Sequence, residues 1–147
     1  MWAGLSLDIF ENFHRQGVKI IVERINCHQA TAKTILDRAY AELGLPADHA
    51  ITDRSIELEN KKLSMAEGIF CPSPMVYKSM IENSVPSYKL LPTSYGWLPG
   101  RFPNLSTEPR NNEKIKFLFV GTLSVRKGVP LLLQAWDEAR IDGELIF

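Results

Sequence analysis

Two adjacent cations, Arg126 and Lys127, stand in a turn between a predicted strand and a predicted helix. An arginine holds phosphate oxygens through two parallel N–H bonds, and a lysine adds a mobile positive charge. The N-terminus of a helix offers free backbone N–H groups and a partial positive charge, which favour an anion. We therefore expect an anion pocket at this turn with a phosphate as its ligand. The alternative is a pair of solvated surface cations.

Three further positions have side chains that could take part in chemistry. Ser73 precedes Pro74 and is expected first as a helix N-cap. It also follows a predicted parallel strand, and ligands bind at that edge of α/β sheets, so it is a candidate cleft residue. Glu57 and Glu59 are two residues apart on a predicted helix and would face different directions. A solvated charged surface is therefore expected there rather than an acid–base pair.

Composition excludes several classes of protein. The chain has 147 residues with 17 acidic and 17 basic side chains, and this balance argues against a nucleic-acid binder. We expect no signal peptide and no membrane-spanning segment. Two cysteines, Cys27 and Cys71, form neither a disulfide framework nor a metal set, so we expect a cytoplasmic protein with reduced thiols and no metal.

Strands alternate with helices along the chain, which predicts an α/β fold with parallel sheets. A helical stripe runs from Trp2 to Phe13, and Gly17 is placed to end it. The other expected helices are 32–43, 55–66, 74–83 and 129–140, and the expected strands are 18–22, 68–71, 89–92, 115–121 and one that begins at 143–147. Residues 96–113 are rich in Gly, Pro and Asn and are expected as a linker. The domains would then be 1–95 and 114–147.

The segment around the two cations resembles the start of the C-terminal domain of the family-4 (group 1) glycosyltransferases. The residues that carry the resemblance are FVGTLSVRKGV (119–129) and LLQAW (132–136). Upstream, IFCPSPMV (69–76), VP (85–86), Lys89, YG (95–96) and Phe102 are similar to the end of the family's N-terminal domain. Glu67 and Ser84 depart from the pattern, where Asp and Gly are usual.

The resemblance implies a GT-B architecture of two Rossmann-like domains. Gly121, Thr122, Arg126 and Lys127 would bind the diphosphate of the donor, with Thr122 standing where many members have Arg. His28 would be the catalytic residue that faces the donor sugar; the alternative is a helix-start or buried histidine. The family's N-terminal glycine-rich loop and downstream glutamate pair lie outside this chain, so we expect a fragment that is inactive by itself.

The implied activity is the retaining transfer of a sugar from a nucleotide-diphosphate sugar to an acceptor hydroxyl, without a metal or other cofactor. The implied partners are that donor and a glycan, lipid or small-molecule acceptor, with peripheral membrane contact of the full-length protein left open. Two alternatives remain. One is a GT-B epimerase that acts on the sugar nucleotide itself, and the other is a non-catalytic nucleotide-sugar-binding module.

Overall fold

The computed structural model describes residues 1, 3–96, 98–101 and 114–147. Two compact units divide the chain, one from Met1 to Trp97 and the other from Leu98 to Phe147. Trp2, the first residue of the predicted helical stripe, lies outside the described residues. So does most of the predicted linker 96–113, of which Pro99–Arg101 form a short 3-10 turn.

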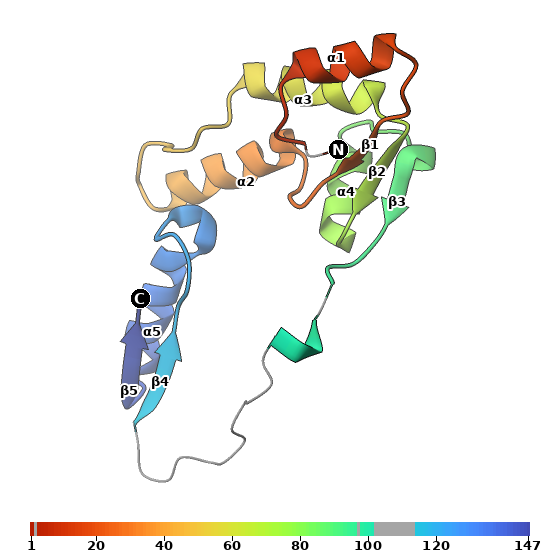
Figure 1. Ribbon diagram of the computed structural model, residues 1–147. Helices are drawn as coiled ribbons and strands as arrows, with labels where there is room; N and C mark the ends of the chain where they lie inside the picture. The colour runs from red at the N-terminus through yellow and green to blue at the C-terminus, as the bar shows by residue number, and fades with distance from the viewer. Residues whose placement is uncertain (2, 97, 102–113) are drawn as a thin grey trace. The chain divides into compact units, whose positions relative to one another are not determined.

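The first unit is built on a small parallel sheet in the order β1-β2-β3 (Figure 1). Its strands are β1 (Ile21–Glu23), β2 (Gly68–Cys71) and β3 (Leu90–Pro92), and a 3-10 turn (Ser87–Lys89) precedes β3. The register places Val22 opposite Ile69 and Ile69 opposite Leu90. The first strand begins at Ile21, not at residue 18 as predicted, because pairing with β2 starts there.

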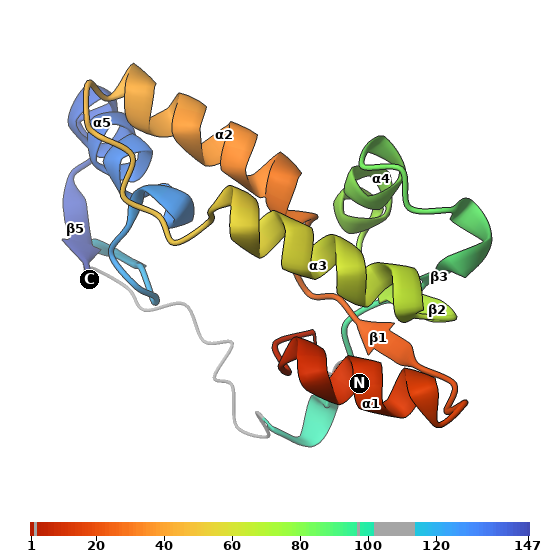
Figure 2. The ribbon, with the colours of Figure 1, turned by 90° about the horizontal axis from the view of Figure 1, so that it is seen from above.

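Four helices connect and cover these strands: α1 (Leu7–Arg15), α2 (Gln29–Glu42), α3 (Asp53–Met65) and α4 (Pro74–Glu82). Their ends follow local signals. Gly17 has φ +70° just after α1, and Ser73 Oγ accepts from the Val76 N–H at 3.2 Å at the start of α4. The predicted N-cap role of Ser73 is thereby confirmed. Helix α3 packs against both α1 and α2, as the views from two sides agree (Figures 1 and 2).

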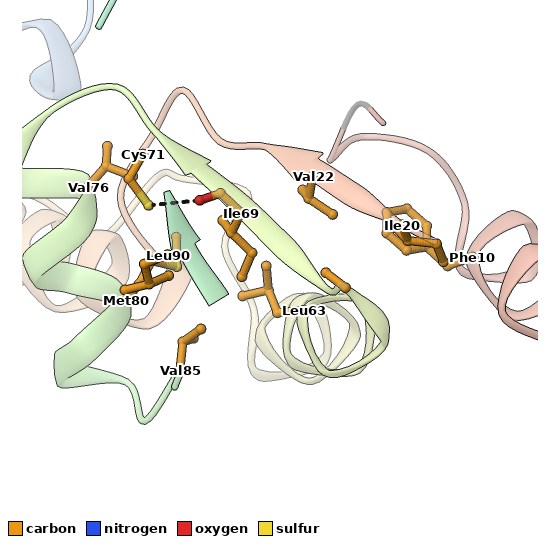
Figure 3. Close-up of a cluster of buried hydrophobic side chains, with 11 residues drawn as sticks. Phe10, Ile20, Val22, Leu63, Ile69, Cys71, Val76, Met80, Val85 and Leu90 are labelled. Carbon is orange, nitrogen blue, oxygen red and sulfur yellow. Dashed lines mark hydrogen bonds between the residues drawn. The ribbon is translucent and has the colours of Figure 1, made fainter. Parts of the chain in front are cut away.

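The core of this unit lies between the sheet and its helices (Figure 3). Each strand contributes side chains to it, and Ile69 on the central strand is completely buried. The buried cluster comprises Phe10, Ile20, Val22, Leu63, Ala66, Ile69, Cys71, Val76, Met80, Val85 and Leu90. Because the three strands are parallel, their carboxyl ends lie at the same edge of the sheet, and the packed core fixes where the loops after them begin.

Residues 114–147 of the second unit contain one parallel β-α-β element. Strand β4 (Ile115–Leu118) pairs with β5 (Gly143–Ile146), and α5 (Val129–Ala139) forms the crossover. Trp136 of α5 packs edge-on against Phe117 at 5.3 Å between ring centroids. A Cβ at Gly143 would lie 2.6 Å from the Ile115 oxygen, so this pairing requires glycine. Strand β4 ends at Leu118 rather than at Gly121 as predicted. The α/β class with parallel strands is confirmed.

Candidate functional site

The two cations lie where the sequence predicts them, between β4 and α5. Val125–Lys127 form a single 3-10 turn, and Gly128 follows with φ +75° before α5 begins. This left-handed conformation favours glycine because it has no Cβ. Both cationic side chains are exposed, and neither forms an ion pair with a carboxylate of the described residues. They are therefore available to a ligand.

Part of the backbone at this turn is already hydrogen-bonded. The Val129 N–H already bonds the Ser124 oxygen at 3.3 Å, and the Lys127 N–H bonds the same oxygen at 3.1 Å. Pro130, in the first turn of α5, has no N–H at all. The N–H groups of Val125, Arg126 and Leu131 have no hydrogen-bond partner among the described residues, so free donors remain beside the cations. An anion at this turn is offered both the side chains of Arg126 and Lys127 and these backbone N–H groups.

Gly121 and Thr122 are exposed in the segment between β4 and the 3-10 turn. A Cβ at Gly121 would meet only the Phe119 ring, at an ordinary 3.6 Å. Glycine is favoured there by its backbone φ of +156° rather than by a crowding neighbour. The fold brings Gly121, Thr122, Arg126 and Lys127 into one short connection, and their role in phosphate binding stays a prediction.

His28 is buried and serves as the N-cap of α2. Its Nδ1 accepts from the Ala30 N–H at 3.2 Å, and its Nε2 lies 2.8 Å from Asn60 Oδ1. Because Nδ1 accepts, the proton belongs on Nε2, which donates to Asn60, and the ring is neutral. The backbone N–H of His28 donates to Ser79 Oγ at 3.0 Å. A sugar hydroxyl reaches Nε2 only if the exposed Asn60 side chain turns away.

Glu59 corrects the expectation of a solvated charged surface. Its side chain is only 3% exposed, and it forms an ion pair with Arg24, whose side chain is 11% exposed. Glu59 Oε2 also accepts the Gln29 N–H at 2.6 Å and lies 3.5 Å from His28 Nε2. Glu57 is exposed as expected, with Arg54 beside it at 3.3 Å. The two glutamates face different directions, as predicted, but only Glu57 faces solvent.

This buried ionic cluster was missed because its charges come from different elements. Arg24 follows β1, and Glu59 lies on α3. One signal was present in the sequence: Glu59 lies between Ile56 and Leu63 at helical spacing, on the face that packs inward. An acidic residue on an apolar stripe indicates a buried charge that requires a partner.

Ser73 borders a small pocket at the carboxyl ends of β2 and β3. The pocket has a volume of about 340 Å³ and is lined by Cys71, Ser73, Tyr77 and Thr93 together with two prolines. Burial raises the pKa of the Cys71 thiol, which keeps it protonated and unreactive. Ser73 is thus placed at a cavity edge, while its hydroxyl serves the α4 cap.

Within the described residues, no group of three or more His, Cys, Asp or Glu side chains is arranged to hold a metal ion. Helices long and apolar enough to cross a bilayer are likewise not found in the described ranges. Comparison of the chain with protein-family models, curated proteins and solved structures gives no match.

Proposed function

We propose that this chain belongs to a retaining glycosyltransferase of the GT-B type, which transfers a sugar from a nucleotide-diphosphate donor to an acceptor hydroxyl. The observation that carries the proposal is the exposed Arg126-Lys127 pair on the connection from β4 to α5 of a parallel β-α-β element. Ligands of open parallel α/β sheets bind outside the carboxyl ends of the strands, where this connection begins. The sequence resemblance of residues 119–136 supports the same role.

In this mechanism the two cations act on the leaving diphosphate. Negative charge builds on it as the bond to the sugar breaks, and fixed positive groups stabilise that charge more in the transition state than in the ground state. Arg126 supplies paired N–H donors, and Lys127 supplies a point charge. A pair of cations can take the place of a metal ion in this task, so we propose a metal-independent reaction.

A second candidate is a non-catalytic nucleotide-sugar-binding module. It is favoured by the state of His28, whose two ring nitrogens already bond Ala30 and Asn60. A histidine that serves as a helix cap need have no role in chemistry. The two candidates share the cation pair and differ in turnover.

The test measures donor affinity and turnover on the full-length protein with UDP-glucose and GDP-mannose as donors. Loss of a charge-assisted hydrogen bond costs about 1.5–3 kcal/mol, so Lys127→Ala should lower donor affinity or turnover roughly 10- to 150-fold. Lys19→Ala is the control, since Lys19 is an exposed cation of the first unit. Unchanged affinity and turnover in Lys127→Ala would refute the proposal. Donor binding without turnover in the unmodified protein would favour the second candidate.

A further inference from the structure

A small cavity lies between α1, β1 and α3, on the side of β1 that faces the core. The two helices run side by side in both views (Figures 1 and 2). The cavity has a volume of about 150 Å³. An engineered apolar cavity of about 150 Å³ in another protein binds benzene, so this one has room for a group of about six non-hydrogen atoms. Neither His28 nor the Arg126-Lys127 pair belongs to its lining.

The apolar part of the cavity wall belongs to the core of the first unit. Phe10 and Val22 are fully buried and Leu63 is nearly so, and all three are members of the buried cluster (Figure 3). Ala3 and Leu58 complete this part of the wall. Because these side chains are already packed, a ligand loses little affinity to ordering them. An apolar group that enters gains the free energy of leaving water.

The polar part of the wall has one cation without a counter-ion. Lys62 Nζ lies 3.4 Å from the Ala3 oxygen and 5.7 Å from the centre of the Phe10 ring. Its side chain is half-buried, and it pairs with no carboxylate of the described residues. The other two charges at the cavity, Arg24 and Glu59, form an ion pair with each other. Two cations and one carboxylate therefore leave a single positive charge.

Two further groups of the wall lack an acceptor in the described part of the chain. The side-chain amide of Gln29 forms no hydrogen bond there, although its backbone N–H donates to Glu59. Arg24 makes its polar contacts through Nη2, and its buried Nε has no partner. A ligand that suits this wall accepts hydrogen bonds and balances the charge of Lys62. A carboxylate does both, because it only accepts hydrogen bonds and has one negative charge.

We propose that this cavity binds a small monocarboxylic acid, whether or not the chain takes part in sugar transfer. The carboxylate lies toward Lys62, and a short apolar tail lies against Phe10, Val22 and Leu63. Inorganic phosphate has no apolar part to fill the cavity and loses its hydration against these side chains. The volume limits the tail to a few carbon atoms, so a free small acid fits and the long tail of a lipid does not.

The test is a titration of the full chain at pH 7, followed by the amide NMR signals of Phe10, Val22 and residues 58–63. Butyrate is the probe, and it should give saturable shifts at these signals. Butyramide has the same tail without the charge and should bind at least about tenfold more weakly. Acetate lacks two CH₂ groups and should bind about 15-fold more weakly, at about fourfold for each buried CH₂. Inorganic phosphate should give no saturable shift.

A pair of variants tests the role of the unpaired cation. Lys62→Gln removes the charge and keeps most of the length of the side chain. It should weaken butyrate binding roughly 10- to 150-fold, the loss of a charge-assisted hydrogen bond. Lys61→Gln is the matched control, since Lys61 is an exposed cation of the same helix that does not line the cavity. Signals from β2 and β3 report whether each variant is folded.

Each of five results would overturn the proposal: no saturable shift with butyrate, equal affinity for butyrate and butyramide, saturation of the same signals by phosphate, tighter binding of octanoate than of butyrate, or equal weakening by Lys62→Gln and Lys61→Gln. The octanoate result would indicate a lipid tail in place of a small acid. Lys127→Ala leaves butyrate binding intact, so failure of the proposed function and failure of this inference are told apart.

Discussion

Replacing Glu59 by glutamine should strongly destabilise the first unit. The carboxylate is buried and serves the Arg24 guanidinium and the Gln29 N–H at once, with His28 close by. Glutamine keeps the size of the side chain but brings an uncharged group against the arginine. The Glu59→Gln change therefore leaves a positive charge inside the protein without its counter-ion.

The expected cost follows from the burial of both partners. Removing one member of a buried ion pair costs about 3–5 kcal/mol, because the other charge stays desolvated. A small domain has only about 5–15 kcal/mol of total stability, so this loss is a large share. Each 1.4 kcal/mol is about tenfold in an equilibrium constant, which gives a change of roughly two to three and a half orders of magnitude.

Hydrogen exchange is the assay, because two units in one chain can unfold separately and a global signal would mix them. The amides of Val22 and Ile69 lie in paired strands at the core and report the opening of the first unit alone. In Glu59→Gln, the protection of these two amides should fall by roughly two to three and a half orders of magnitude. The control is Glu57→Gln on the same helix, an exposed pair worth about 0.5 kcal/mol or less, which predicts about a twofold change.

A double variant distinguishes the effect of an unpaired buried charge from a general disruption of packing. Arg24→Met with Glu59→Leu removes both charges, and we expect it to recover most of the protection lost in Glu59→Gln. The Gln29 N–H then lacks its acceptor, so recovery should be incomplete by about 1 kcal/mol. Protection in Glu59→Gln within threefold of that in Glu57→Gln would refute the reasoning. The reasoning would also be refuted if the double variant lost as much stability as the Arg24→Met and Glu59→Leu variants lose in total.

Two further predictions concern local features. Ser84 has φ +63° just after α4, a left-handed conformation that strains a residue with a Cβ. Ser84→Gly should relieve this strain and raise the free energy of unfolding, measured by urea denaturation, by about 0.5–1 kcal/mol. An unchanged or lower free energy of unfolding would contradict this. The Lys33 ammonium, and after it the His49 ring, lower the pKa of Asp37. Its ionised form therefore stabilises the fold above the unfolded-state pKa, and that stability is lost as the pH falls through the lower folded-state pKa. Asp37→Asn should be less stable than the unmodified protein at pH 7, and the gap should close in acid; a gap independent of pH in thermal melts would count against it.

Much of the fold could be predicted because its signals are local. Ser73-Pro74 marked the start of α4, and the turn with Arg126 and Lys127 fell between β4 and α5 as expected. Strand ends were less well predicted, since β1 starts at Ile21 and β4 stops at Leu118. A short strand begins and ends where its neighbour can pair, and the partner of β1 lies more than 40 residues further along the chain.

The features of the candidate site likewise fall into those that local sequence specifies and those that depend on tertiary contacts. The amino-acid sequence by itself determined the order of strands and helices, the Ser73 cap of α4 and the place of the cation pair, because each depends on residues a few positions apart. Only the tertiary structure decided that Glu59 is buried and that the ring of His28 is fully engaged. Those features join groups 30 to 51 residues apart, such as Gln29 with Glu59 and His28 with Ser79. The free energy of such contacts depends on burial, which no local pattern specifies.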